Sequence, residues 1–391
     1  MRAVFFKLLL FVISIAAALF LLELGLRLVP KYEEPVTIND EPHIRRIYKP
    51  GLDLQVRSED GGSWVRFKTN SYGFQDNEWE IPKKGIRIAN NGDSYVAGQI
   101  FYEDNFAHQI GKILTEKMEE PVESLSFGVG RQGTDDAYNT YRYYTKLSDP
   151  DIVVLWMYMG NDYHDNLDHV VTEEATSSDQ GLTTTHEKLN FFKYVIQNSE
   201  LVQLILRAKE HSLFVQKTVT FIKNTPFLKD VAYGAYLNEP TEEITLIFTS
   251  VNEARNEKAV ELVREYLTKF RDEVAADGKK FFVFILPIQF QIDDETLGRI
   301  LDQYPALQEM GFDSTKPRDV TVGILEELSI SYYDLTDFFK GECDGQYNCP
   351  MYQCRYCHLS ARGHRRVAEA ASDVLYEKFF KKSEIFETTR E

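Results

Sequence analysis

Apolar residues along the chain form short, near-continuous runs that alternate with longer segments of helical spacing. The runs predict strands at 85–89, 122–127, 152–158, 281–286 and 330–335. The spaced segments predict helices at 105–118, 135–147, 256–276 and 361–380. Runs without a polar face indicate strands that are buried on both sides, as in parallel sheets. This alternation therefore predicts an α/β fold with a mainly parallel sheet and helices on both faces, a three-layer sandwich.

Three stretches depart from this rhythm. Residues 8–22 are apolar apart from one serine, and Arg2 and Lys7 precede them, so residues 1–29 are predicted to be a transmembrane anchor with the bulk of the chain outside the cytoplasm. A cleaved signal peptide is the alternative. Residues 30–60 are polar and contain proline, which predicts a stalk before a catalytic domain at 61–391. Within that domain, 163–242 is predicted to be a helical insertion that serves as a lid or as a buttress.

Charge narrows the range of partners. The chain has 391 residues, with 44 Lys and Arg against 61 Asp and Glu, which gives a net charge of −17. Such a surface repels nucleic-acid phosphates, so no nucleic-acid partner is expected.

Chemistry-bearing residues gather where the predicted strands end. Gly92, Asp93 and Ser94 follow the first strand, the glycine-rich run 126–134 follows the second, and Gly160-Asn161-Asp162 follows the third. His358 comes late in the chain and precedes the last helix. Because ligands bind at the carboxyl ends of strands in such sheets, these stretches should meet. A serine, oxyanion donors and a histidine base are the components of an acyl-transfer site.

The order of these four blocks resembles the SGNH/GDSL family of serine esterases and acyltransferases, from about Tyr48 to the end of the chain. The resemblance implies a flavodoxin-like sheet with Ser94 as nucleophile and His358 as base. It implies oxyanion donors from the backbone of Ser94 and Arg131 and from the amide of Asn161. Gly92, Asp93 and Asp162 would support these groups, and no cofactor or metal is expected.

Two positions depart from the family pattern. In the best register the glycine of the second block is replaced by Arg131, which leaves the backbone donor intact. The aspartate expected three residues before His358 is replaced by Arg355, which leaves the acid of the triad unassigned. Asp334, Asp337 and Asp344 are the candidate substitutes, and a Ser-His dyad is the alternative.

All four cysteines, Cys343, Cys349, Cys354 and Cys357, fall within fifteen residues before His358. Two local disulfides are predicted, with the pairing open and zinc as the alternative. A second metal alternative is the loop after Asn161, which contains His164 and His169. Its spacing imposes no site.

The predicted function is a membrane-anchored, extracytoplasmic serine esterase that acts on acyl esters. By resemblance to anchored family members, the substrate is an O-acetyl ester of a surface glycan. Acyl transfer with the same residues is one alternative. A catalytically weak glycan-binding or scaffold protein is the other, motivated by Arg131 and Arg355.

Overall fold

The computed structural model describes residues 2–28, 37–40, 44–57, 64–98, 100–168, 242–343, 349–353 and 358–381. The chain divides into two compact units. The first contains α1 (Arg2–Leu28), so the apolar N-terminal run is helical. Among the described residues, no helix combines the length and hydropathy that a membrane span requires. The second unit contains the remaining elements and all of the predicted site residues.

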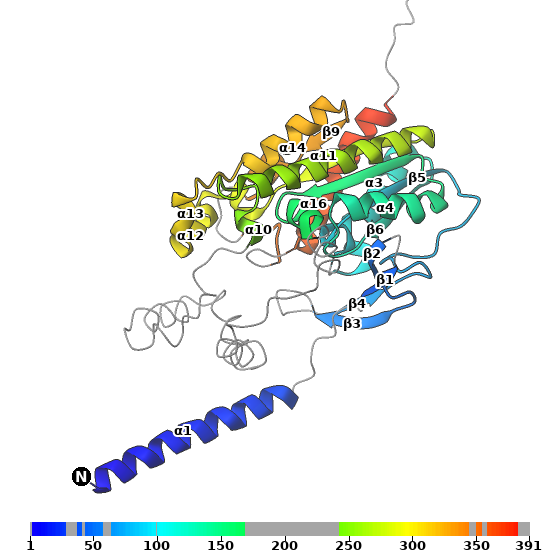
Figure 1. Ribbon diagram of the computed structural model, residues 1–391. Coiled ribbons are helices and arrows are strands. Elements are labelled where there is room, and N and C mark those ends of the chain that lie inside the picture. The colour runs from blue at the N-terminus through cyan, green and yellow to red at the C-terminus, as the bar shows by residue number, and fades with distance from the viewer. Residues whose placement is uncertain are drawn as a thin grey trace, which may run out of the picture. The chain divides into compact units, whose positions relative to one another are not determined.

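A five-stranded parallel sheet forms the centre of the second unit (Figure 1). Its strands lie in the order β6-β5-β7-β8-β9. Their bounds are β5 (Ile86–Gly92), β6 (Val122–Gly128), β7 (Ile152–Tyr158), β8 (Lys280–Leu286) and β9 (Tyr332–Asp334). Counted in chain order this is 2-1-3-4-5, the flavodoxin-like arrangement. The predicted α/β class and parallel sheet are therefore confirmed.

Helices and small antiparallel pairs complete the unit. Its α-helices are α2 (Ser94–Ala97), α3 (Phe106–Met118), α4 (Thr134–Tyr143), α10 (Glu242–Thr245), α11 (Glu253–Ala276), α12 (Asp294–Gln303), α13 (Ala306–Glu309), α14 (Lys316–Glu327), α15 (Thr336–Cys343) and α16 (Ala361–Phe379). Single 3-10 turns are η1 (Tyr102–Asp104), η2 (Thr145–Ser148) and η3 (Gln289–Gln291). The other strands are β1 (Thr37–Asp40), β2 (Ile44–Tyr48), β3 (Asp53–Arg57) and β4 (Trp64–Lys68), paired β1 with β2 and β3 with β4.

Two hydrophobic layers cover the sheet, one on each face. Along β7, Val154 and Trp156 pack with α3 and α16, whereas Val153 and Leu155 pack with α4, α11 and α14. Successive side chains of a strand point to opposite faces, so a strand covered on both sides must be apolar throughout. This is why the 152–158 run contains no polar alternation.

The strands carry their motifs to one edge of the sheet. Gly92 at the end of β5 pairs in register with Gly128 of β6 and with Trp156 of β7. The segments that follow these strands therefore leave the sheet side by side. In the 2-1-3-4-5 order, β5 and β7 flank the point where the strand order reverses, which is where such folds place their ligands.

Part of the predicted stalk belongs to this unit. Within 30–60, the strands β2 and β3 are formed, and Ile47 and Val56 are buried in a third cluster with Leu125 and Phe127 of β6. The linker prediction is therefore corrected for 44–57. Charged residues and prolines around these short strands hide their apolar positions in the sequence pattern.

The first residues of the predicted insertion, 163–168, fall within the described part of the chain. Residues 162–168 are helical, and Tyr163 and Leu167 are buried in the same cluster as α11. Residues 169–241, the greater part of the insertion, lie outside the described residues.

Candidate active site

Ser94 lies on a tight turn between β5 and α2. A Cβ atom at Gly92 would come within 2.9 Å of the Trp156 carbonyl oxygen, so a side chain there would push β5 and β7 apart. Asp93 caps α2, because its carboxylate accepts a hydrogen bond from the Tyr95 N–H at 2.9 Å. The turn thereby presents Ser94 as the first residue of a helix, with its side chain partly exposed.

The structure brings Ser94 and His358 together across 264 residues of sequence. Ser94 Oγ and His358 Nε2 lie 2.7 Å apart, a hydrogen-bond distance. A hydroxyl that donates to a neutral imidazole is the arrangement in which histidine can act as general base.

A short hairpin holds His358 in place. The backbone N–H of Gln353 donates to the His358 carbonyl at 2.9 Å, and Tyr352 pairs with Leu359 across the same bridge. Ser360 then caps α16 by accepting from the Gly363 N–H at 3.1 Å. The imidazole therefore lies between two backbone anchors, and its position does not depend on side-chain packing alone.

The cysteines stabilise the entry to this hairpin. Cys343, the last residue of α15, forms a disulfide with Cys349, and their Cα atoms are 4.8 Å apart. Both are buried. This confirms the prediction of a local disulfide for one pair. Cys354 and Cys357 lie outside the described residues, so the second predicted pair is untested.

The second block approaches Ser94 from β6. A Cβ atom at Gly128 would lie 2.3 Å from the Ala97 nitrogen, so only glycine permits β6 to end against α2. A Cβ atom at Gly130 would lie 3.7 Å from the Ser94 Cβ. Arg131 follows with φ of 61°, a left-handed backbone conformation that suits glycine and costs an L-residue roughly 1–2 kcal/mol. The conformation agrees with the register in which Arg131 occupies the family's glycine position.

The third block carries an amide next to buried carboxylates. Asn161 Nδ2 donates to Asp165 Oδ2 at 2.5 Å, and the Asp165 N–H donates to the Asn161 carbonyl at 2.8 Å. Asp162 turns back and accepts from the Tyr158 N–H at 3.1 Å. Asn161 is thus held by the residue one helical turn later, and its amide also interacts with the Asp93 carboxylate.

Unusually many carboxyl groups are buried around these blocks. Asp93, Asp135, Asp136, Asp162 and Asp165 are each less than 8% exposed. Burial raises the pKa of Asp93 to about 6, although the His358 imidazole and the Asn161 amide oppose this shift. Burial, reinforced by neighbouring carboxylates, also raises the pKa of Asp162 and Asp135 well above the ordinary value. The site therefore favours neutral carboxyls and protonated forms over additional negative charge.

Two of the three predicted acid partners of His358, Asp334 and Asp337, make no contact with it in the described structure. Asp334 accepts from Arg318 and from the Thr336 N–H and hydroxyl, so both of its oxygens are engaged away from the hairpin. Asp337 is exposed on α15. Asp344 and Arg355 lie outside the described residues. Asp93 is one carboxylate that interacts electrostatically with His358.

Three residues near the site were not predicted from the sequence. Asp165 positions Asn161, and the only signal for it is the four-residue spacing between them. Tyr48 of β2 accepts from the Gly130 N–H at 3.1 Å, and no local pattern connects these distant residues. The Tyr95 ring lies 5.1 Å from the His358 ring and is stacked on Tyr158 at 4.0 Å. Its place directly after the nucleophile is the one clue in the sequence.

The loop after Asn161 does not assemble a metal centre in the described part of the chain. His164 lies 3.5 Å from Asp165 and 3.7 Å from Asp168, as ion-pair partners. No group of three or more His, Cys, Asp or Glu side chains among the described residues has the geometry to hold a metal ion. His169 lies outside those residues.

The chain is structurally similar to several solved proteins. No family model and no curated protein matches the chain. A lipase/acylhydrolase from Enterococcus faecalis is 12% identical, with a TM-score of 0.39 over 75% of this chain and 96% of its own. The acetyl xylan esterase AlAXEase is 12% identical, with a TM-score of 0.40 over 74% and 100%. A lipolytic protein of the G-D-S-L family from Desulfitobacterium hafniense is 12% identical, with a TM-score of 0.36 over 74% and 99%.

These proteins carry names of the family that the four sequence blocks resemble. Their TM-scores lie below 0.5, so the likeness itself assigns neither fold nor activity to this chain. The strand order and the contact between Ser94 and His358 are the observations on which a functional proposal must rest.

Proposed function

We propose that this protein is a serine hydrolase of the SGNH type that cleaves acyl esters. The observation that carries the proposal is the 2.7 Å contact between Ser94 Oγ and His358 Nε2 at the carboxyl edge of a parallel sheet. The blocks that would supply oxyanion donors follow β6 and β7, the two strands that flank β5 in the sheet.

The reaction would proceed in two stages. His358 takes the proton of Ser94 as the hydroxyl attacks the ester carbonyl, and the protonated imidazole then gives that proton to the departing alkoxide. Water attacks the acyl-enzyme with His358 again as base, which releases the carboxylic acid and restores the Ser94 hydroxyl.

Donors for the oxyanion come from three positions. In the described part of the chain, the backbone N–H groups of Ser94 and Arg131 make no hydrogen bond within the protein. The amide of Asn161, which is held by Asp165 and interacts with Asp93, is the third. Donors that are fixed before the reaction stabilise developing negative charge without reorganising.

The substrate class rests on the motif resemblance. Anchored proteins with these blocks are associated with acyl groups on surface polysaccharides, and we propose an O-acetyl ester of a glycan as substrate. Attachment to a membrane through residues 1–29 and an extracytoplasmic location are predictions from the apolar run and its flanking charges.

A fluorophosphonate probe tests the nucleophile directly. The full-length protein should be labelled at Ser94, and Ser94→Ala should lose both labelling and hydrolysis of a short-chain aryl ester. Ser250→Ala, which removes an exposed hydroxyl outside the site, is the matched control and should retain both. Labelling that persists in Ser94→Ala would refute the assignment. Absence of labelling in the wild-type protein would favour the glycan-binding alternative.

An acceptor experiment separates hydrolysis from transfer. If a sugar alcohol added to the ester assay diverts the acyl group from acetic acid to a sugar ester, the acyl-enzyme is being trapped by a hydroxyl, and the protein is an acyltransferase that uses the same residues.

A further inference from the structure

Arg131 has a backbone conformation that glycine would adopt without strain. Six non-glycine residues in the described part of the chain have positive φ, and two of them, Glu119 and Asp149, are helix C-caps, where this conformation is ordinary. Arg131 instead lies in the loop that faces the nucleophile, directly after Gly130. Glycine at this position would supply the same backbone N–H, so the oxyanion role does not explain an arginine.

The Arg131 side chain has no partner within the described protein. It is exposed, and it makes no ion pair or hydrogen bond with any described residue. The strain of the left-handed backbone is therefore not compensated by side-chain contacts with the described residues. Strained residues cluster at sites that bind ligands, where the position of the side chain matters more than local stability.

The backbone of a second arginine, Arg46, lies next to the same loop. Gln132 Nε2 donates to the Arg46 carbonyl at 2.9 Å, and Tyr48 accepts from the Gly130 N–H, so β2 runs along the loop. The neighbouring Arg45 is neutralised by Asp136 at 3.0 Å. Arg46 is partly exposed and helps to lower the pKa of Asp136 electrostatically, but it makes no ion pair or side-chain hydrogen bond with any described residue.

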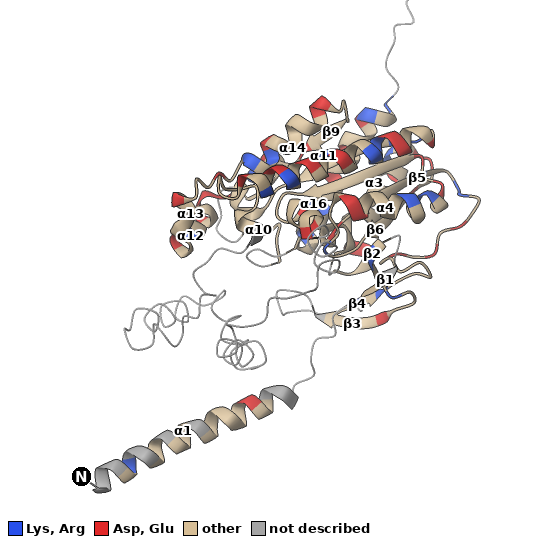
Figure 2. Cartoon of the chain, in the orientation of Figure 1, with Lys and Arg blue, Asp and Glu red and all other residues tan. Residues whose placement is uncertain are grey.

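These cations lie on a protein that is acidic overall. Its net charge is −17, and Figure 2 shows acidic and basic positions interspersed along α11 and α14. The carboxyl groups nearest the loop, including Asp135 and Asp165, are buried beneath it. Without a local positive group, an anionic substrate would be repelled by the acidic surface.

We propose that Arg131 and Arg46 form a subsite for an anionic group of the substrate, next to the ester that Ser94 attacks. The inference rests on the proposed esterase function and adds a substrate class: acyl esters of sugars that carry a carboxylate, phosphate or sulfate. A guanidinium presents paired N–H donors that match such oxygens in two-point contacts.

Matched substrates isolate the anionic group. Mono-O-acetylated methyl glucuronoside and methyl glucoside differ only in a carboxylate against a hydroxymethyl group, and an acetylated glucose 6-phosphate adds a phosphate. The measured quantity is the ratio of kcat/KM for the anionic ester to kcat/KM for the neutral one, at low and at high salt. Whichever anion gives the higher ratio distinguishes a uronic acid from a phosphorylated sugar.

The ratio should fall about tenfold in Arg131→Gly, because a charge-assisted hydrogen bond is lost. The ratio should fall less in Arg131→Lys, which keeps the charge but not the paired donors. In Arg46→Gln the ratio should lie between the values for wild type and Arg131→Gly. High salt should reduce the wild-type ratio toward the Arg131→Gly value. Lys84→Gln, which removes one charge from a side chain that is 81% exposed at the amino end of β5, should leave the ratio unchanged.

Binding to the Ser94→Ala protein separates failure of the subsite from failure of the esterase. Calorimetry should detect tighter binding of the acetylated glucuronoside or glucose 6-phosphate than of the glucoside, with the difference lost in Ser94→Ala/Arg131→Gly. Equal ratios and equal binding in the presence and absence of Arg131 would overturn the subsite while leaving Ser94 labelling intact. An equal fall in Lys84→Gln would reduce the effect to overall charge and would also overturn it.

Discussion

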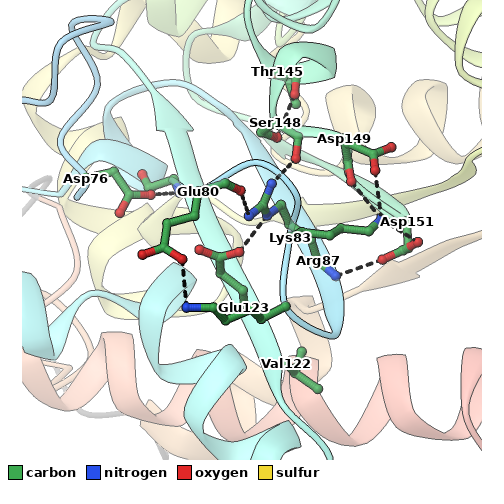
Figure 3. Close-up of polar contacts among 12 residues, drawn as sticks. Asp76, Glu80, Lys83, Arg87, Val122, Glu123, Thr145, Ser148, Asp149 and Asp151 are labelled. Atoms are coloured by element: carbon green, nitrogen blue, oxygen red, sulfur yellow. Dashed lines mark hydrogen bonds and ion pairs between the residues drawn. The ribbon is translucent and has the colours of Figure 1, made fainter. Parts of the chain in front are cut away.

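The two ends of the strands in the central sheet differ in how completely their buried charged groups are paired. At the amino edge, the guanidinium of Arg87 is 1% exposed and is bound by the Glu123 carboxylate at 2.6 Å and by the backbone carbonyls of Ser148 and Glu80 (Figure 3). At the carboxyl edge, Asp93 and Asp162 are equally buried, yet each has a carboxylate oxygen without a hydrogen bond of standard geometry.

The surroundings of these groups extend the contrast. Lys83 donates to Asp151 at 2.7 Å (Figure 3). Lys279 donates to Asp149 at 2.6 Å, so the cations and carboxylates of the amino edge balance. Among the described residues, the five buried acids of the carboxyl edge outnumber the arginines that interact with them, Arg45 and Arg46. A balanced network stabilises a fold, whereas unbalanced and partly unsatisfied groups are typical of functional sites.

The largest effect should come from the base at the carboxyl edge. His358→Ala should lower kcat on a short-chain ester by about five orders of magnitude or more, because loss of one member of a nucleophile and base pair removes most of the catalysis. The urea midpoint should barely change, since His358 packs in a hairpin that its backbone holds. A variant that loses its activity only by unfolding would contradict a catalytic role.

Arg87→Met should lower stability with little effect on activity, the reverse of the result expected for His358→Ala. Removing one partner of a buried ionic network leaves the others uncompensated and costs about 3–5 kcal/mol of unfolding free energy. Activity per folded molecule should stay within a few-fold of wild type, because β5 carries Ser94 at its other end. Urea unfolding measures the loss, and Lys84→Met, which removes an exposed partner of Glu80, is the control with an expected change of about 0.5 kcal/mol or less. A loss for Arg87→Met as small as that of the control would remove the distinction between the edges.

The next largest effect is expected from Asn161→Ala, which should raise the activation free energy of the reaction. An oxyanion donor acts mainly in the transition state, so kcat should fall by about 10²–10³ while KM changes little. Steady-state kinetics on one ester, over a range that brackets KM, separates the two parameters. A change confined to KM would make Asn161 a substrate-binding residue.

Sequence patterns predicted the sheet and the site motifs because both depend on local features. The apolar runs of β7 and β8 require burial on both faces, and a motif that follows a parallel strand necessarily emerges at the carboxyl edge. The position of Arg131 was also predictable, since a backbone conformation suited to glycine belongs to the turn rather than to the side chain.

Contacts between residues far apart in the sequence were not predictable, because no local pattern specifies them. Nothing near Arg87 in the sequence shows that the chain returns at Glu80, Glu123 and Ser148 to bind its guanidinium. Likewise β2 was assigned to a stalk, because its contact with Gly130 joins residues 82 positions apart. The helices α12 to α14 connect β8 with β9, and the sequence pattern gave no prediction for them.

The smallest predicted effect tests the contrast most directly, because its sign is the reverse of that for Arg87. The ordinary pKa of Asp93 is 3.8 and burial raises it to about 6, so the native state holds this proton more tightly than the unfolded chain does. Stability should therefore fall as pH rises from about 4 to about 6, and the penalty should then remain constant, at no more than about 3 kcal/mol. Asp93→Asn keeps an oxygen to cap the Tyr95 N–H and removes the charge, so it should be more stable than wild type near pH 7.5 by about 1–3 kcal/mol.

The comparison must be made at two pH values, because Asp135 and Asp162 titrate in the same direction. Wild type and Asp93→Asn should have nearly equal urea midpoints near about pH 4, where Asp93 is neutral in the native state, and should diverge as the pH rises. The difference between the two proteins cancels the contributions of the other buried acids. If Asp93→Asn is instead less stable at the higher pH, the ionised Asp93 carboxylate stabilises the native state. Its negative charge would then be compensated by a positive charge, such as a protonated His358, and the contrast between the two edges would not hold.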